Sequence, residues 1–327
     1  MELKDLRTRI DNIDDQLIDL FRARMDVSSE IAASKRESGA AVWNRSRERK
    51  VLNRVTERVG EGYENYAKLL YQTIFAVSRS CQNRLLGNDG DFAKRIRTAA
   101  ANTSALFPSK AVVACQGVEG AYSQQACDKL FSLPSILYFR QFDGVFQAVE
   151  SGMCRYGILP IDNSSNGSVG RVYDLMRNYR FHIVRSIRLC VRHSLLAKPG
   201  TALSDVKEIV SHEQAIGQCS AFLKEQKGVK VTVCENTAAA ARMVAESDRR
   251  DIAAISSTHC AALYGLDVLS DHVQNSENNY TRFICIGKDL EIFPGANRIS
   301  LMLSTAHRPG SLYELLSKFA AIGVNLT

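Results

Sequence analysis

Apolar residues recur three or four positions apart through the first part of the chain. The stretch from Leu3 to about Arg36 contains neither proline nor glycine, and its regularly spaced apolar positions are Leu6, Ile10, Ile13, Leu17, Leu20, Val27 and Ile31. This period is typical of one long amphipathic α-helix. Such a helix would be roughly 50 Å long, which exceeds the width of a small domain, so we expect a second chain to cover part of it.

Two further helices are expected after this one. A glycine at position 39 interrupts the pattern, a second helix is predicted from about Arg45 to Val59, and a third is predicted over residues 63–86. Residues 1–87 are therefore expected to form an all-α, three-helix domain. Residues 88–109 lose the periodicity and gather Gly, Asn, Ser and Thr with one Pro, which indicates a linker.

From residue 111 the pattern changes to short apolar runs that alternate with amphipathic segments. Strands are expected at 111–117, 155–162, 182–197, 208–212, 230–235, 251–256 and 281–287, with helices at 144–152, 217–226 and 237–246. This alternation predicts an α/β domain over residues 110–288, with a largely parallel sheet and a length that suits two lobes. Ligands of such sheets usually bind beyond the carboxyl ends of the strands.

The end of the chain carries one more pair of elements. A strand over residues 298–306 and a helix over residues 308–325 are expected within the segment 296–327. So small a unit cannot bury a core of its own, so it either docks elsewhere or belongs to a larger module.

Composition limits the class of protein. Hydrophobic residues make up 45% of the chain and charged residues 24%, which is ordinary for a soluble globular protein. No apolar run approaches the ~20 residues of a membrane-spanning helix, and the charged N-terminus does not resemble a signal peptide. We therefore expect a cytoplasmic protein without a membrane partner. The nine cysteines are scattered without a CxxC pair, so neither a zinc site nor a disulfide framework is expected.

A dense run of charge, VWNRSRERK at residues 42–50, opens the predicted second helix. A solvated helix face is the ordinary explanation of such a run, and an anion site or a nucleic-acid surface are the alternatives. The same region is rich in acids, which repel phosphate and argue against nucleic acid. The run places Glu48 among Arg45, Arg47, Arg49 and Lys50, and the acids include Asp11, Asp14, Asp15, Asp19, Asp26 and Glu30.

Helix geometry supplies partners for this run. Arg24 and Lys35 are eleven residues apart, close to three whole turns, so they share one face of the first helix. Arg7 lies about 100° from that face, so it would have to reach the same site from a partner's copy of the helix. Ser78 and Gln82 are neighbours at i,i+4 on the third helix. This set suits a small dianion that carries a hydroxyl group, because Arg binds carboxylates bidentately.

The helical region resembles the all-α class of chorismate mutases at these positions. The matching substrate-site residues are Arg7, Arg24, Lys35, Arg47, Glu48, Ser78 and Gln82, and Asn44 stands where related bifunctional bacterial enzymes have Asp. The resemblance implies an intertwined dimer that rearranges chorismate to prephenate without proton transfer. It further implies that Arg24 and the partner's Arg7 bind carboxylates, and that Lys35 and Gln82 donate to the breaking ether oxygen. In the same way, Arg47, Glu48 and Asn44 would orient the ring.

Three clusters of small and polar residues lie in the α/β region, at 117–126, 160–170 and 278–283. The first follows a strand and opens a helix, so its backbone N–H groups could receive an anion. For each cluster taken alone, an ordinary turn or cap is the better explanation. A hydrolase built on Ser164 with His182 or His212 is disfavoured because the chain lacks a G-x-S-x-G elbow.

Taken together, the clusters resemble prephenate dehydratases from about Lys110 to Lys288. The matches are Thr281-Arg282-Phe283, the segment with Gly117, Gly120, Tyr122 and Ser123, the segment with Ser211, His212, Gln218 and Cys219, and the loop with Asn163, Ser164 and Gly167, in which Asp162 replaces the usual Glu. The resemblance implies two α/β lobes like those of a periplasmic binding protein, and loss of water and carbon dioxide from prephenate. It also implies that Thr281 is the proton donor, and that Arg282 and amides near Ser164 bind carboxylates, with Ser123, Asn163 and Phe283 nearby.

The last segment resembles the opening of an ACT domain, a phenylalanine-binding regulatory module. Gly310, Ser311 and Leu312 match its ligand-side turn, and the second half of the module is absent from the given chain, so we expect an impaired response to phenylalanine. The resemblances together indicate a bifunctional chorismate mutase/prephenate dehydratase of phenylalanine biosynthesis, a homodimer or higher homo-oligomer without metal or organic cofactor. The alternative is a helical dimerisation module fused to a non-catalytic sensor of aromatic acids.

Overall fold

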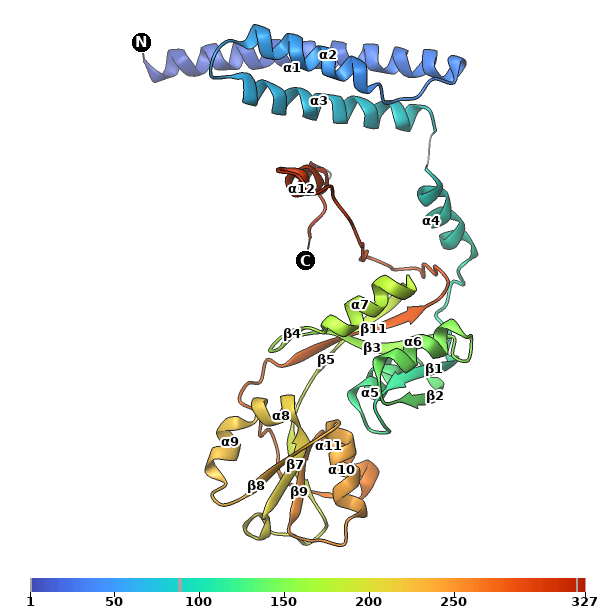
Figure 1. The fold of residues 1–327 in the computed structure, drawn as a ribbon, viewed down its shortest axis with the longest axis vertical. Coiled ribbons are helices and arrows are strands. Elements are labelled where there is room, and N and C mark those ends of the chain that lie inside the picture. Colours follow the sequence, from blue (N-terminus) through green and yellow to red (C-terminus); the bar gives the residue numbers. More distant parts are fainter. Residues whose placement is uncertain (1, 88–89, 322, 327) are drawn as a thin grey trace. The chain divides into compact units, whose positions relative to one another are not determined.

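The chain folds into two compact units, residues 1–98 and residues 99–327. The computed structural model describes residues 2–87, 90–321 and 323–326 (Figure 1). The division falls inside a helix, α4 (Asp91–Asn102), in the segment where the sequence indicated a linker without periodicity. That segment therefore contains more regular structure than expected, because Phe92 and Ile96 stand one turn apart and alanines favour the helix that follows.

The first unit is built on three helices, which confirms the prediction to within two residues at each end. They are α1 (Leu3–Ser38), α2 (Arg45–Val59) and α3 (Glu64–Leu85), and α3 packs against both of the others. Gly39 ends α1 in the left-handed conformation, with φ of 66°. Asn44 begins α2, because its side chain accepts a hydrogen bond from the Arg47 N–H at 2.9 Å.

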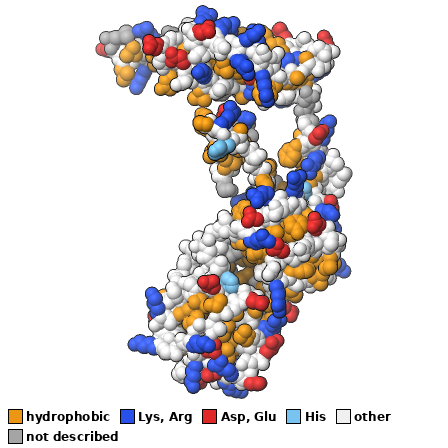
Figure 2. All heavy atoms as spheres, viewed as in Figure 1, with side chains coloured by type: hydrophobic (Ala, Val, Ile, Leu, Met, Phe, Trp, Pro, Cys, Tyr) orange, Lys and Arg blue, Asp and Glu red, His pale blue; other side chains and the backbone are white. Residues whose placement is uncertain are grey.

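Much of the apolar face of α1 is uncovered in the single chain. Ser28 and Ala32 are the buried residues of this helix. The space-filling view shows hydrophobic side chains interspersed with lysines and arginines on the visible face of the unit (Figure 2). The apolar residues of α1 that remain exposed are Leu3, Leu6, Ile10, Ile13, Leu17, Ile18, Leu20, Phe21, Val27 and Ile31.

The first α/β lobe is a mixed sheet with strand order β2-β1-β3-β11-β5 and a short strand, β4, paired with β3. Strands β1 and β2, and β1 and β3, are parallel, whereas β11 runs antiparallel to both β3 and β5. The strands are β1 (Lys110–Gln116), β2 (Leu133–Phe139), β3 (Tyr156–Asn163), β4 (Gly167–Ser168), β5 (His182–Cys190) and β11 (Tyr280–Gly287). The prediction of a largely parallel sheet is wrong here, because β11 re-enters this lobe from the second lobe without a crossover helix.

Helices cover both faces of this sheet. One core gathers residues of α6 and α7 against one face, and another gathers residues of α5 against the opposite face. The helices are α5 (Tyr122–Leu130), α6 (Phe142–Glu150) and α7 (Gly170–Tyr179). Residues of one strand alternate between the two cores, as the pleat of a strand requires.

The second lobe has its own sheet, with strand order β10-β6-β9-β7-β8. The segment 182–197, expected as one strand, forms β5 in the first lobe and β6 in the second. The strands are β6 (Ser194–Ala197), β7 (Glu208–His212), β8 (Lys230–Cys234), β9 (Ile252–Ser256) and β10 (Asp267–Ser270), and the helices are η1 (Leu203–Asp205), α8 (Glu213–Gln218), α9 (Ser220–Glu225), α10 (Thr237–Glu246) and α11 (Thr258–Tyr264). Two sheets with separate cores confirm the expectation of two lobes.

Two chain crossings join the lobes, residues 191–193 and residues 271–279. They are bonded to each other and to the strands beside them. The Val191 N–H donates to the Asn279 carbonyl at 2.7 Å, and the Val273 N–H donates to the His193 carbonyl at 2.9 Å. The crossings therefore form one hydrogen-bonded junction.

The last segment departs from its prediction. Residues 298–306 are extended without forming a strand, because no strand of the described chain offers them a hydrogen-bonded ladder. The expected helix is present as α12 (Ser311–Ala321). At its start Gly310 has φ of 83°, Ser311 is 8% exposed and Leu312 is 63% exposed. None of the described helices is long and apolar enough to cross a membrane.

Candidate active sites

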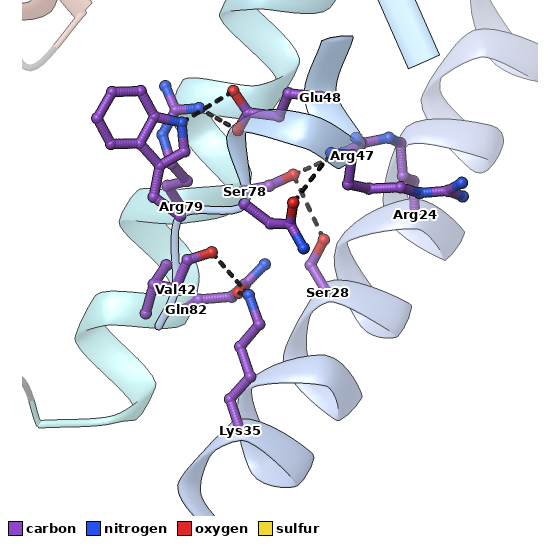
Figure 3. A network of polar contacts seen from close by, with 11 residues as sticks. Arg24, Ser28, Lys35, Val42, Arg47, Glu48, Ser78, Arg79 and Gln82 are labelled. Atoms are coloured by element: carbon purple, nitrogen blue, oxygen red, sulfur yellow. Dashed lines mark hydrogen bonds and ion pairs between the residues drawn. The ribbon is translucent and has the colours of Figure 1, made fainter. Parts of the chain in front are cut away.

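A polar cluster lies between α1 and α3 of the helical unit. The Arg24 guanidinium donates to the Ser78 hydroxyl at 2.5 Å, and Ser28 donates to the same hydroxyl at 3.3 Å (Figure 3). One to three turns further along, the Lys35 ammonium donates to Gln82 Oε1 at 3.2 Å and to the Val42 carbonyl at 2.6 Å. The structure therefore brings together four of the predicted residues, Arg24, Lys35, Ser78 and Gln82, on two helices.

The cluster is partly shielded from water. Ser78 and Gln82 are 6% and 7% exposed. Burial lowers the pKa of Arg24, yet a guanidinium titrates so far above neutrality that it keeps its charge. Because Gln82 Oε1 accepts from Lys35, the amide hydrogens of Gln82 are the groups it can offer to a ligand. Two cations and a buried amide donor suit an anionic ligand with polar oxygens.

Glu48 lies at the edge of this cluster with partners that the sequence did not indicate. It forms an ion pair with Arg79 of α3 and accepts a hydrogen bond from the Trp43 indole at 3.2 Å. Asn44, the predicted substrate residue just before α2, caps that helix. The sequence signal for Arg79 was its position directly after Ser78 on α3. That signal does not single it out, because Ser80 lies equally close to Ser78 in the sequence.

Arg7 and Arg47 are not part of this contact network within one chain. Arg7 precedes Arg24 by seventeen positions on the same continuous helix, which separates their Cα atoms by about 25 Å along the axis. Arg47 is exposed in the first turn of α2. An Arg7 side chain could therefore reach such a cluster only from another copy of the chain.

The second candidate site lies where β3 ends and β11 begins, at the junction of the lobes. Asn163 stands opposite Thr281 across the two strands. Its amide Nδ2 lies 2.9 Å from the Thr281 hydroxyl oxygen and donates to it. Its Oδ1 accepts the backbone N–H groups of Ser165 and Asn166 at 3.0 and 2.9 Å. The turn after β3 thus fixes the amide that holds the Thr281 hydroxyl.

Side-chain hydrogen bonds continue from this pair into the second lobe. Asn163 Nδ2 also donates to Asn279 Oδ1 at 2.8 Å, and Asn279 Nδ2 donates to Gln218 Oε1 at 2.9 Å. His193 Nε2 lies 3.0 Å from the same Gln218 oxygen. Because that oxygen is an acceptor, His193 carries its proton on Nε2. A continuous chain of side chains therefore joins Thr281 to a histidine of the lobe junction.

Two members of this chain were missed from the sequence. Asn279 is 2% exposed and lies two residues before Thr281. Its presence in the polar run NNYTRF is the sequence feature that could have identified it as a site residue. His193 is 2% exposed, and burial lowers its pKa below the ordinary value. The sequence around His193 is largely apolar, so it gave no sign that this histidine belongs to a polar network at the lobe junction.

Arg282 and Phe283 make contacts outside the polar network of Thr281. Arg282 forms an ion pair with Asp162 at 2.6 Å, directly across the sheet. Strand alternation places its side chain on the face opposite to that of Thr281. Phe283 is 3% exposed and packs in the core beneath α5. These residues therefore stabilise the sheet around Thr281 and do not share its polar network.

The serines and the glycine segment are likewise engaged within the protein. The Ser164 hydroxyl donates to the Asn278 carbonyl and accepts the Tyr280 N–H, both at 2.9 Å. Ser123 is 4% exposed near the start of α5. The N–H groups of Gly117, Gly120 and Ala121, expected to receive an anion, donate to protein oxygens. The segment is used instead to contact the second lobe, where Cys260 Sγ donates to the Gly120 carbonyl.

Comparisons with known proteins find a matching family for each of the two regions that carry these candidate sites. The family model for prephenate dehydratase matches residues 113–291, and that for chorismate mutase type II matches residues 6–83. The bifunctional chorismate mutase/prephenate dehydratase of Escherichia coli is 29% identical over 326 residues, covering 95% of this chain and 79% of that protein.

Two other relatives match about two thirds of the chain. Arogenate dehydratase 2 of Petunia hybrida is 38% identical over 222 residues, covering 67% of this chain, and the chain spans 56% of that protein's length. The structure of prephenate dehydratase from Arthrobacter aurescens in complex with L-Phe has a TM-score of 0.57 and 27% identity, covering 66% of this chain and 74% of that one. Because the dehydratase model matches more than half of the residues, the chain belongs to the prephenate dehydratase family, with a chorismate mutase type II region before it.

Proposed function

We propose that the chain catalyses two successive reactions of phenylalanine biosynthesis. The helical unit would rearrange chorismate to prephenate, and the α/β unit would convert prephenate to phenylpyruvate. The observation that carries the proposal is the cluster of Arg24, Lys35, Ser78 and Gln82 in the same chain as the Asn163–Thr281 pair. The printed name of the Escherichia coli relative, which aligns with 95% of this chain, joins the same two activities.

The first reaction needs positioning and charge stabilisation alone. Chorismate carries two carboxylates, and its rearrangement breaks an ether bond on which negative charge develops. Arg24 would bind a carboxylate, while the Lys35 ammonium and the Gln82 amide hydrogens would donate to the ether oxygen. Because Lys35 is already held by Gln82 and Val42, little reorganisation is needed when the charge appears.

The second reaction needs an acid at the departing hydroxyl group. The bond from the ring to its carboxylate breaks, the electron pair completes the aromatic ring, and the hydroxyl leaves as water after it takes up a proton. Thr281 Oγ1 accepts a hydrogen bond from Asn163, so its own hydroxyl hydrogen is free to be donated. Thr281 is 8% exposed, which favours a directed proton transfer over exchange with bulk water.

Assembly and regulation belong to the same proposal. The exposed apolar face of α1 and the distance of Arg7 from Arg24 support a homodimer in which the partner's Arg7 completes the helical site. A cytoplasmic location suits substrates of this kind. The turn at Gly310, Ser311 and Leu312 is proposed as part of a phenylalanine-responsive segment, for which the L-Phe complex of the Arthrobacter aurescens protein gives a precedent.

The experiment is to incubate the purified chain with chorismate and follow prephenate and phenylpyruvate. We expect both products in sequence, and chorismate consumed no faster than in buffer would overturn the proposal. Lys35→Ala should abolish the first step and spare the conversion of added prephenate, whereas Thr281→Ala should do the reverse. Loss of both activities in either folded variant would contradict separate sites. Arogenate, tested beside prephenate, shows which of the two the α/β unit prefers.

A further inference from the structure

Two residues outside the proposed chemistry hold the carboxylate of Glu48 from one side. Arg79 of α3 pairs with Oε1, and the Trp43 indole N–H donates to Oε2 at 3.2 Å (Figure 3). The Arg79 and Glu48 side chains are 30% and 24% exposed, so the pair is sheltered but reachable. Each carboxylate oxygen has a donor and retains a second acceptor site.

The same two residues also contact each other. The Arg79 guanidinium lies 5.6 Å from the centroid of the Trp43 ring, within the range of cation–π attraction. Arg45 lies over the ring at 4.2 Å. Trp43, Glu48 and Arg79 therefore form a closed triangle. It ties the loop before α2, the first turn of α2 and the middle of α3 at one point.

Charge explains why such a triangle is useful. Glu48 is a carboxylate at the edge of the cluster that contains Arg24 and Lys35, and it directly follows Arg47 in the chain. These three cations are the ones proposed to bind a dianionic substrate. An unrestrained carboxylate would be drawn to any of them and would compete with the substrate. Across the residues that the structure describes, the cation that pairs with Glu48 is Arg79, and those three remain available.

We propose that Arg79 and Trp43 are positioning residues of the helical site. They keep the Glu48 carboxylate away from the substrate-binding cations and direct its remaining acceptor sites to the hydroxyl of the substrate ring. Neither residue needs to touch the substrate. This inference rests on the proposed mutase function, and it adds two residues that the motifs of the sequence did not contain.

The test compares Arg79→Gln with Arg79→Lys. The control is Arg49→Gln, which removes one exposed charge from α2, the helix that carries Glu48. In an active wild-type background, Arg79→Gln should lower kcat/KM for chorismate by about tenfold or more, as expected when a group that contacts substrate loses its position. The loss should lie in kcat as well as KM. Arg79→Lys should recover part of it, Arg49→Gln should match the wild type, and conversion of added prephenate should be unchanged in all three.

Trp43 gives a readout that does not depend on turnover, because it is the one tryptophan of the chain. Acrylamide should quench its emission more strongly in Arg79→Gln than in the wild type or Arg49→Gln, since the indole loses the Arg79 guanidinium and its partner Glu48 is no longer held. Unchanged mutase kinetics in Arg79→Gln, or equal quenching, would overturn the inference. If Arg79→Gln does not fold, Trp43→Phe takes its place. That variant must lower mutase activity while the conversion of added prephenate stays unchanged, or the inference fails. A wild type inactive on chorismate refutes the proposed function, and quenching still decides whether the triangle exists.

Discussion

At the scale of single residues, His193 makes the stability of the α/β unit depend on pH. Its folded pKa lies below the ordinary value of about 6.5 because burial disfavours the imidazolium. Above the ordinary pKa of about 6.5, the imidazole ring is neutral in both the folded and the unfolded state, so the histidine costs no stability. As the pH falls below the ordinary pKa, the unfolded chain takes up the proton first. The free energy of unfolding then declines until the pH reaches the lower pKa of the folded state.

His193→Gln should therefore reduce the acid sensitivity of this unit. Glutamine retains an N–H donor for Gln218 Oε1 and has no titratable group. Between about pH 7 and pH 5 the calorimetric transition of the α/β unit should fall by fewer degrees in the variant than in the wild type. His212, whose pKa is also lowered by burial, remains and accounts for the residual slope. An identical fall in the two proteins would contradict this origin of the acid sensitivity.

The residues of the two sites were unequally predictable from the sequence. Arg24, Lys35, Ser78 and Gln82 were predictable because helical spacing puts each pair on one face of its own helix, and the family resemblance assigns both pairs to one site. Asn279 and His193 were not, since their meeting depends on how two chain crossings pair between lobes. The ion pair of Arg282 with Asp162 was not predicted either, because it depends on the register between β3 and β11, which the Thr-Arg-Phe motif does not contain.

At the scale of elements, the cap of α2 holds the first turn of that helix, which carries Arg47 and Glu48, in its helical conformation. Asn44→Ala removes the acceptor for the Arg47 N–H and should lower the free energy of unfolding of the helical unit by about 1 kcal/mol. Asn44→Asp keeps the acceptor and adds negative charge at a helix N-terminus, so it should be at least as stable as the wild type. Urea unfolding followed by Trp43 emission measures both, and a wild-type midpoint for Asn44→Ala would show that the cap contributes nothing.

The elements themselves were predictable where one periodicity runs unbroken. Helices α1, α2 and α3 satisfy this condition. Gly39 at the end of α1 and Asn44 at the start of α2 also mark the boundary between those two helices. The segment 182–197 does not, because a continuous apolar run says nothing about the point where the chain leaves one sheet for another. Residues 298–306 have the pattern of a strand, yet a strand also requires a neighbour to pair with, which local sequence cannot supply.

At the scale of the whole molecule, the long helix α1 carries both Arg7 and Lys35, which lie about 42 Å apart along its axis. No bending of one helix brings them to a common ligand. If a dimer completes the helical site, then each site combines the Lys35 of one subunit with the Arg7 of the other. Arg7→Ala and Lys35→Ala should each abolish mutase activity as pure proteins, since each damages both sites of its own dimer.

Mixing these two inactive proteins should restore activity. After subunit exchange, a mixed dimer contains one site with both native residues and one site with neither, so equal amounts should recover about a quarter of the wild-type mutase activity. The matched control mixes Lys35→Ala with Gln82→Ala. Both of those residues serve the site of their own chain, as their 3.2 Å contact indicates, so this mixture should stay inactive. Recovery in the control, or none in the first mixture despite proven exchange, would mean that Arg7 does not act across the dimer. The apolar face of α1 would then have to be covered in some other way.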